Sequence, residues 1–280
     1  MCDDGRLTYR QMNERTQRVM KPLGRIKGEL LPISWNQASE AIADRVRELA
    51  PEAGEVLALT DTQASNEELF LLKKLMREAF GSDRTFFSMP EWQQPESDFF
   101  INTLITTDRS PNRAGARELG LQGDVDGSLV GAATELPAKV VLLLGNPYPG
   151  AAELRERVAN AQLIVQITPF QNEWSAVADV VLPGQLHSEK DVTYTNKDRR
   201  VQRTHTAVVG PRQSLPEWKV LSGLMNALGQ DPGYASVEEV FESLGQEAPA
   251  FAGLSWSALP ATGYVLPGSN DDPGRVTASA

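Results

Sequence analysis

A short glycine-containing turn follows one of the most apolar segments of the chain. Gly145, Asn146 and Pro147 come directly after Val140–Leu144, an unbroken apolar run typical of a buried strand. Where a parallel strand ends, a small turn lets backbone N–H groups approach a phosphate. The alternative interpretation is that Gly-Asn-Pro only turns the chain away from the sheet. The sequence therefore indicates either an anion site or a structural turn at Gly145.

Other residue types that could do chemistry are sparse. Lys197 to Arg203 form a basic cluster in an acidic chain, which could face a phosphate or an acidic partner, or form a solvated hairpin. Acidic pairs such as Glu67–Glu68 could serve acid/base chemistry, but solvated acids are also expected at helix starts, where the helix dipole favours them. His187 and His205 are expected to be surface or hydrogen-bonding residues. Cys2 is the only cysteine, which excludes an intramolecular disulfide.

Helices and strands alternate along the chain and would position these residues. Ser34 with Gln37 and Ser65 with Glu68 have capping-box spacing, and the same spacing recurs at Ser214 and Ser236. Short apolar runs that predict strands are Glu55–Leu59, Thr85–Ser88, Val140–Leu144, Leu163–Ile167 and Asp179–Leu182. This alternation predicts a Rossmann-like α/β fold, with a mostly parallel sheet, helices on both faces, and two βαβ halves joined by a long connection over residues 90–137.

The composition narrows the possible partners. The net charge is −10 and the sequence pI is about 4.9, which argues against nucleic-acid binding. No apolar run is long enough to span a bilayer, so we expect no direct membrane insertion. The residues after Met1 do not read as a signal peptide, because charges begin at Asp3.

Four sequence blocks, read in order over residues 2 to 230, have the spacing of one known family. The first runs from Cys2 to Glu29 and contains Asp-x-Gly-Arg and an R-x-x-x-P-x-x-R-x-x-G-like pattern. The second is Ile33-Ser-Trp-Asn36, the third ends in the Gly-Asn-Pro turn, and the fourth runs from Ala178 to Gln202. Together they resemble the molybdopterin oxidoreductase family.

Two further segments narrow the resemblance within that family. Met1–Arg6 and Asn112–Gly120 are most similar to the molybdopterin-type domain of the G subunit of bacterial NADH-quinone oxidoreductase (respiratory complex I), truncated at its N-terminus. The resemblance implies a non-catalytic scaffold domain in the electron-transferring peripheral arm. The expected partners are the other subunits of that enzyme, and the expected location is cytoplasmic, at the inner face of the cell membrane.

The resemblance also implies cofactors, a [4Fe–4S] cluster and molybdopterin guanine dinucleotide. Cys2 matches the last cluster ligand, but a cubane normally needs four thiolates, so we expect a vestigial site. Val192 and Arg199 replace glycines of the family pattern, and we expect them to fill space or change the backbone. We therefore expect no cofactor in this chain alone. The vestigial pterin-site candidates are Gly145, Asn146, Pro147, Asp179, Glu189, Thr193, Asn196, Arg200 and Gln202.

Two other functions remain open at this point. The chain could be a fragment of a molybdenum-dependent, formate dehydrogenase-like oxidoreductase that binds bis-molybdopterin guanine dinucleotide, or a free-standing nucleotide- or phosphate-binding module. In each case the predicted organisation is the same. It comprises an N-terminal segment (1–33, a remnant of the iron–sulfur domain junction), the α/β core (34–232), a helical extension (233–262) and a disordered tail (263–280).

Overall fold

The structure of the chain is a computed structural model that describes residues 10, 14–88, 110–123, 138–147 and 152–267. Cys2, and with it the prediction of a vestigial cluster ligand, lies outside the described residues. The same holds for most of the connection over residues 90–137 and for residues 268–280 of the predicted tail. Within the described part, no helix is long and apolar enough to cross a membrane.

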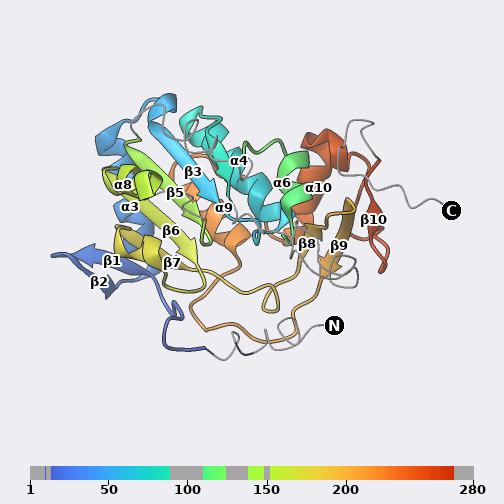
Figure 1. Ribbon diagram of the computed structural model, residues 1–280, viewed down its shortest axis with the longest axis horizontal. Helices are drawn as coiled ribbons and strands as arrows, with labels where there is room; N and C mark the ends of the chain where they lie inside the picture. The colour runs from blue at the N-terminus through green and yellow to red at the C-terminus, as the bar shows by residue number, and fades with distance from the viewer. Residues whose placement is uncertain (1–9, 11–13, 89–109, 124–137, 148–151, 268–280) are drawn as a thin grey trace, which may run out of the picture.

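A seven-stranded sheet with strand order β2-β1-β7-β6-β5-β3-β4 forms the centre of the fold (Figure 1). Five neighbouring strands pair in parallel, which confirms the predicted mostly parallel sheet. Each of them is short and rich in apolar residues, as is typical of strands that are covered on both faces. They are β3 (Val56–Thr60), β4 (Thr85–Phe87), β5 (Val140–Leu144), β6 (Leu163–Thr168) and β7 (Val180–Pro183). The strand order reverses between β3 and β5, because β3 lies between β4 and β5.

One edge of this sheet is antiparallel. The hairpin of β1 (Leu23–Ile26) and β2 (Glu29–Pro32) joins it through pairing of β1 with β7. The side chain of Arg25 donates hydrogen bonds to the carbonyl oxygens of Ala178, Ser175 and Ala176, which fixes the hairpin to the segment before β7. Residues before Ser34 therefore contribute to the central sheet.

The helices begin at residues that the sequence marks. α3 (Trp35–Leu49) and α4 (Asn66–Phe80) have reciprocal capping boxes at Ser34 and Ser65, as predicted, and Ser236 caps α10 (Val237–Glu247). The capping box predicted at Ser214 is wrong, because Pro216 precedes α9 (Glu217–Ala227) and no side chain caps it. The described residues also form α6 (Arg113–Glu118), α8 (Ala152–Ala159) and the short 3₁₀ turns Ala53–Glu55, Glu173–Ala176 and Pro249–Phe251.

Hydrophobic cores lie on both faces of the sheet. On one face, α3, α4, α9 and α10 pack over alternate strand residues such as Val56, Val140 and Leu142. On the other face, Leu57 and Val141 contact a smaller core that includes Leu154 and Val158 of α8 and the fully buried Trp174. This alternation of sides follows from the two-residue period of a strand and confirms the helices expected on both faces.

A small antiparallel sheet lies beside α4 and α6. It has the order β10-β9-β8, with β8 (Val192–Thr195), β9 (Arg200–Thr204) and β10 (Tyr264–Val265). Residues after Pro232 also join the main core, because Phe241 of α10 and Trp256 meet edge to face, with ring centroids 5.8 Å apart. β8 and β9 carry Thr193, Arg200 and Gln202 of the fourth family-like block, so this small sheet determines where those three residues lie.

Candidate functional site

A cleft of about 870 Å³ lies at the carboxyl edge of the parallel sheet. The segments that follow β3, β5 and β6 line the cleft together with residues of the loop and hairpin after β7, which include Lys190, Tyr194 and Gln202. Ligands of open α/β sheets bind at this edge, near the point where strand order reverses. Here that point lies between β3 and β5, at Asp61 and Gly145.

The turn after β5 is in contact with the Asp61 carboxylate, which follows β3. Asn146 N–H donates to Asp61 Oδ2 over 2.7 Å, and Gln63 N–H donates to Asp61 Oδ1 over 2.8 Å. Gly145 has a φ of +76°, and a Cβ at this position would lie 2.4 Å from Asp61 Oδ2. Glycine is therefore required here by the left-handed backbone and by the close carboxylate. Burial raises the pKa of Asp61, although the N–H groups of Asn146 and Gln63 oppose that rise.

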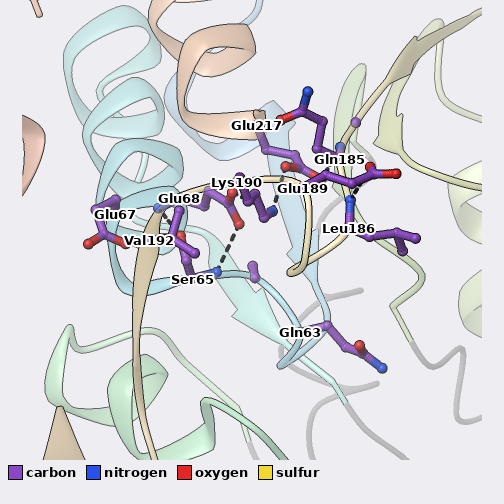
Figure 2. Close-up of polar contacts among 12 residues, drawn as sticks. Gln63, Ser65, Glu67, Glu68, Gln185, Leu186, Glu189, Lys190, Val192 and Glu217 are labelled. Carbon is purple, nitrogen blue, oxygen red and sulfur yellow. Dashed lines mark hydrogen bonds and ion pairs between the residues drawn. The ribbon is translucent and has the colours of Figure 1, made fainter. Parts of the chain in front are cut away.

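A buried ion cluster forms the inner wall of the cleft (Figure 2). Lys190 Nζ lies 2.6 Å from Glu68 Oε1 of α4 and 2.6 Å from Glu217 Oε2 of α9, and the three side chains are only 1–6% exposed. Burial opposes the charged ammonium, but the Glu217 and Glu68 carboxylates raise the pKa of Lys190 above its ordinary value. Burial raises the pKa of Glu217 to about 8 against the opposing effect of Lys190. The cluster joins the loop after β7 to the starts of two helices.

A second buried ion pair joins the N-terminal part of the chain to the same loop. Arg18 contacts the Glu189 carboxylate, and its guanidinium lies 5.2 Å from the ring centroid of Phe170. Glu189 Oε2 also accepts from Leu186 N–H over 2.9 Å. Arg18 and Lys190 are thus both held by carboxylates of the chain itself.

A buried polar network links the start of α4 to β8. Glu67 accepts hydrogen bonds from the backbone N–H and the hydroxyl of Thr193, and the Thr193 hydroxyl accepts from the Asn66 side chain. The Thr195 hydroxyl donates to Asn66 Oδ1, and the Thr195 N–H donates to Asn112 Oδ1. Burial raises the pKa of Glu67 to about 7. Glu67 and Glu68 are fully buried, so the expectation of a solvated acidic pair at this helix start is wrong.

The structure brings together only part of the candidate set from the sequence. Gly145, Asn146 and Gln202 line the cleft, whereas Asp179 lies at the opposite, amino edge of the sheet. There its carboxylate accepts from Ile164 N–H over 2.8 Å and aligns β6 with β7. Asp179 cannot therefore act on the same ligand as the turn after β5.

The other candidates have structural contacts. Pro147 is buried, and its carbonyl accepts from the Trp174 indole over 2.7 Å. Asn196 forms the β8–β9 turn, where its side chain accepts from Asp198 N–H and Arg200 N–H. Arg200 Nη1 donates to the Thr262 carbonyl over 3.3 Å. Together with Glu189 in its ion pair and Thr193 in the α4 network, these residues hold the loop and hairpin in place.

Val192 and Arg199 stand where the family pattern has glycines, and at Arg199 the backbone differs from the prediction. Arg199 has a φ of +59°, so the left-handed backbone suited to glycine is kept rather than changed. Its side chain contacts the Glu118 carboxylate and donates to the Pro267 carbonyl, which favours this unusual conformation for arginine. Val192 fills space as expected, because it is fully buried in the main core.

Residues that sequence reasoning missed dominate the cleft. Asp61, Lys190 and Tyr194 were not site candidates. Glu217 was predicted only as a helix-capping residue, and Glu68 as a capping residue or as part of an acidic pair. A usable signal existed for Asp61, because it directly follows a buried strand next to the one that ends at Gly145. In the described part of the chain, no group of three or more His, Cys, Asp or Glu side chains is arranged to hold a metal ion.

Comparisons with known proteins agree with this architecture. The F420-dependent formate dehydrogenase 1 subunit alpha of Methanococcus maripaludis is 32% identical over 143 residues, covering 49% of this chain and 21% of that protein. A putative formate dehydrogenase of Staphylococcus aureus (strain bovine RF122 / ET3-1) is 35% identical over 100 residues, covering 36% of this chain and 10% of that protein. The chain thus spans about a fifth or less of these relatives.

A solved structure and a family profile complete the comparison. Acetylene hydratase from Pelobacter acetylenicus superposes with a TM-score of 0.55 at 12% identity, over 92% of this chain and 67% of that chain, which supports the fold. The profile of the family described as molybdopterin oxidoreductase matches residues 18–89 and 86–227. This chain therefore belongs to the molybdopterin oxidoreductase family.

Proposed function

We propose that this chain is the α/β domain of a larger redox subunit, and that it supports that subunit structurally instead of holding the phosphates of a pterin cofactor. The observation that carries the proposal is that groups of the chain itself hold the cations that line the cleft. Lys190 lies between two buried carboxylates, and Arg203 donates to the Trp256 carbonyl with its guanidinium 5.3 Å from the centroid of the Trp256 ring. Among the described lining residues, the carboxylates outnumber these cations: Glu14, Asp61, Glu68 and Glu217.

The fit of molybdopterin guanine dinucleotide to this cleft is therefore poor. Its phosphates are anions and need free N–H groups or unpaired cations. The Asn146 N–H that faces the cleft is already bound to Asp61, and Gly145 N–H donates to the Ile167 carbonyl over 2.8 Å. A phosphate at this turn would have to displace the Asp61 side chain from the Asn146 N–H.

The relatives support a formate dehydrogenase-like subunit as the setting for this domain. The alpha subunits from Methanococcus maripaludis match between a third and a half of the chain at 32% and 37% identity. This supports the formate dehydrogenase-like interpretation better than the NADH-quinone oxidoreductase interpretation drawn from Met1–Arg6 and Asn112–Gly120. The NADH-quinone oxidoreductase setting stays a proposal. In either setting the domain would lie inside a multi-subunit redox protein.

A cofactor-bearing domain is the second candidate function. The size of the cleft favours it, because about 870 Å³ is large enough for a nucleotide-sized group. Its position at the carboxyl edge, where strand order reverses, is also the expected position for such a group. The two candidates differ in one measurable quantity, which is the amount of pterin held per chain.

Purification of the tagged chain from its native host, grown with molybdate, separates these candidates. The eluate would be analysed for pterin, molybdenum, iron and co-purifying polypeptides. We expect partner polypeptides of a redox enzyme and no stoichiometric pterin on this domain. Partners of formate dehydrogenase type would support the first setting, and NADH-quinone oxidoreductase subunits the second. Stoichiometric molybdopterin on a complex in which this chain is the sole family member would overturn the structural role.

A further inference from the structure

A side chain of the protein itself, that of Asp61, lies across the carboxyl ends of β3 and β5. β3 and β5 are paired in parallel from Val56–Val140 to Thr60–Leu144, so the residues that follow them, Asp61 and Gly145, lie next to each other. In addition, Asp61 N–H donates to the Leu144 carbonyl over 3.3 Å. The position where an open α/β sheet offers backbone N–H groups to a ligand is thus the position of the Asp61 carboxylate.

The carboxylate has the contacts that a bound anion would have. Its oxygens accept from Asn146 N–H over 2.7 Å and from Gln63 N–H over 2.8 Å. These two residues follow β5 and β3, so both N–H groups belong to turns at the carboxyl ends of strands. The whole group lies over Gly145, where a Cβ would be 2.4 Å from Oδ2, 2.8 Å from Cγ and 2.9 Å from Oδ1. Glycine at this point normally permits a ligand to approach the backbone, and here it permits the approach of Asp61.

We propose that the Asp61 carboxylate is a built-in substitute for a ligand anion, and that it closes the turn after β5 to phosphate groups. This inference rests on the proposed function and names the residue that makes the cleft reject phosphate. Two effects act together. The carboxylate takes the N–H of Asn146, and its charge repels an incoming anion at the same position. Removing the side chain should therefore open a phosphate site.

Asp61→Ala tests this inference with pyrophosphate as the probe. The variant frees the N–H groups of Asn146 and Gln63 and opens the space over Gly145, with the Lys190 ammonium nearby. We expect calorimetric titration to show saturable binding to Asp61→Ala at least about tenfold tighter than to the unmodified chain. Asp44→Ala is the charge control, because Asp44 is an exposed acid on α3 that pairs only with Arg47 among the described contacts. It should bind pyrophosphate as weakly as the unmodified chain.

Asp61→Asn separates the effect of filling the space over Gly145 from the effect of the negative charge of Asp61. Asparagine fills the same space and its carbonyl oxygen can still accept from Asn146 N–H, so only the charge is lost and the gain in affinity should be smaller than in Asp61→Ala. A gain in Asp61→Asn equal to that in Asp61→Ala would overturn the proposal, since charge alone would then close the site. A folded Asp61→Ala that gains no affinity would also overturn it.

A measurement on the unmodified chain covers the case in which Asp61→Ala does not fold. The backbone amide resonances of Asn146 and Gln63 would be followed by NMR as millimolar pyrophosphate is added. We expect both to stay unshifted, and a saturable shift of either would overturn the proposal. A result that overturns the closed turn does not by itself overturn the proposed structural role of the domain, and the reverse also holds. Pyrophosphate could bind at the turn of a chain that carries no pterin, and a pterin could occupy the cleft away from a closed turn.

Discussion

Replacing Lys190 with methionine removes the buried cation that joins three segments of the fold. Lys190 Nζ lies 2.6 Å from both Glu68 and Glu217, and none of the three side chains is more than 6% exposed. Methionine keeps the volume and leaves the carboxylates facing each other without a counter-charge. Removing one partner of a buried ion pair costs about 3–5 kcal/mol, and we expect a loss of this size in the free energy of unfolding.

The loss should also depend on pH. Burial already raises the pKa of Glu217 to about 8, above its value of 4.5 in the unfolded chain, so its ionisation destabilises the fold as pH rises through this window. Without Lys190 the pKa of Glu217 rises further, because the cation that opposed burial is gone. Protonation then relieves the repulsion at low pH. We expect a larger loss at about pH 8.5 than at about pH 5.5.

Urea denaturation followed by tryptophan fluorescence measures both effects, because Trp174 and Trp218 are buried in the folded chain. Lys197→Met is the matched control: Lys197 is 49% exposed and pairs with Asp198 at the tip of the β8–β9 hairpin. That control should cost less than about 0.5 kcal/mol. A difference of less than about 1 kcal/mol between the two variants at both pH values, or a loss in Lys190→Met that is independent of pH, would contradict a stabilising role for the buried cation.

Two further substitutions test other parts of the cleft wall. Burial raises the pKa of Glu67 from 4.5 to about 7, so the folded chain should lose stability as pH rises through that interval, and Glu67→Gln should remove this loss. Urea midpoints at about pH 5 and about pH 8 check it, and an unchanged pH dependence in the variant would contradict it. Gly145→Ala should destabilise the chain more than Gly229→Ala, since both glycines have positive φ but only at Gly145 would a Cβ meet a neighbour within 4 Å. Equal shifts of the thermal midpoint would show that the carboxylate over Gly145 moves away at no cost.

The sequence predicts the elements of this fold well where the signals are local. Capping boxes at Ser34 and Ser65 and the apolar runs of β3 and β5 reappear within a residue or so of their expected bounds. These signals are carried by residues three or four apart, or by one short strand. The capping box expected at Ser214 failed because Glu217 instead accepts from Gln185 N–H and pairs with Lys190.

The site was harder to predict because its contacts join distant parts of the chain. Lys190 and Glu68 are 122 positions apart, and Asn146 and Asp61 are 85 apart. Asp179 was misassigned for another reason: the run Asp179–Leu182 already places it at the start of a strand and therefore at the amino edge, but the family-like block groups it with residues that follow β7. Arg199 shows the opposite case, in which a glycine was lost but its backbone conformation was kept through contacts with Glu118 and Pro267.

An electron cryo-microscopy map of the native assembly, isolated from cells grown with molybdate, tests most directly whether this domain shapes a redox subunit without holding a pterin phosphate at the turn after β5. We expect the Asp61 carboxylate to contact the N–H of Asn146, with no phosphate over Gly145. A pterin phosphate within hydrogen-bonding distance of Asn146 N–H, with Asp61 turned away, would contradict it.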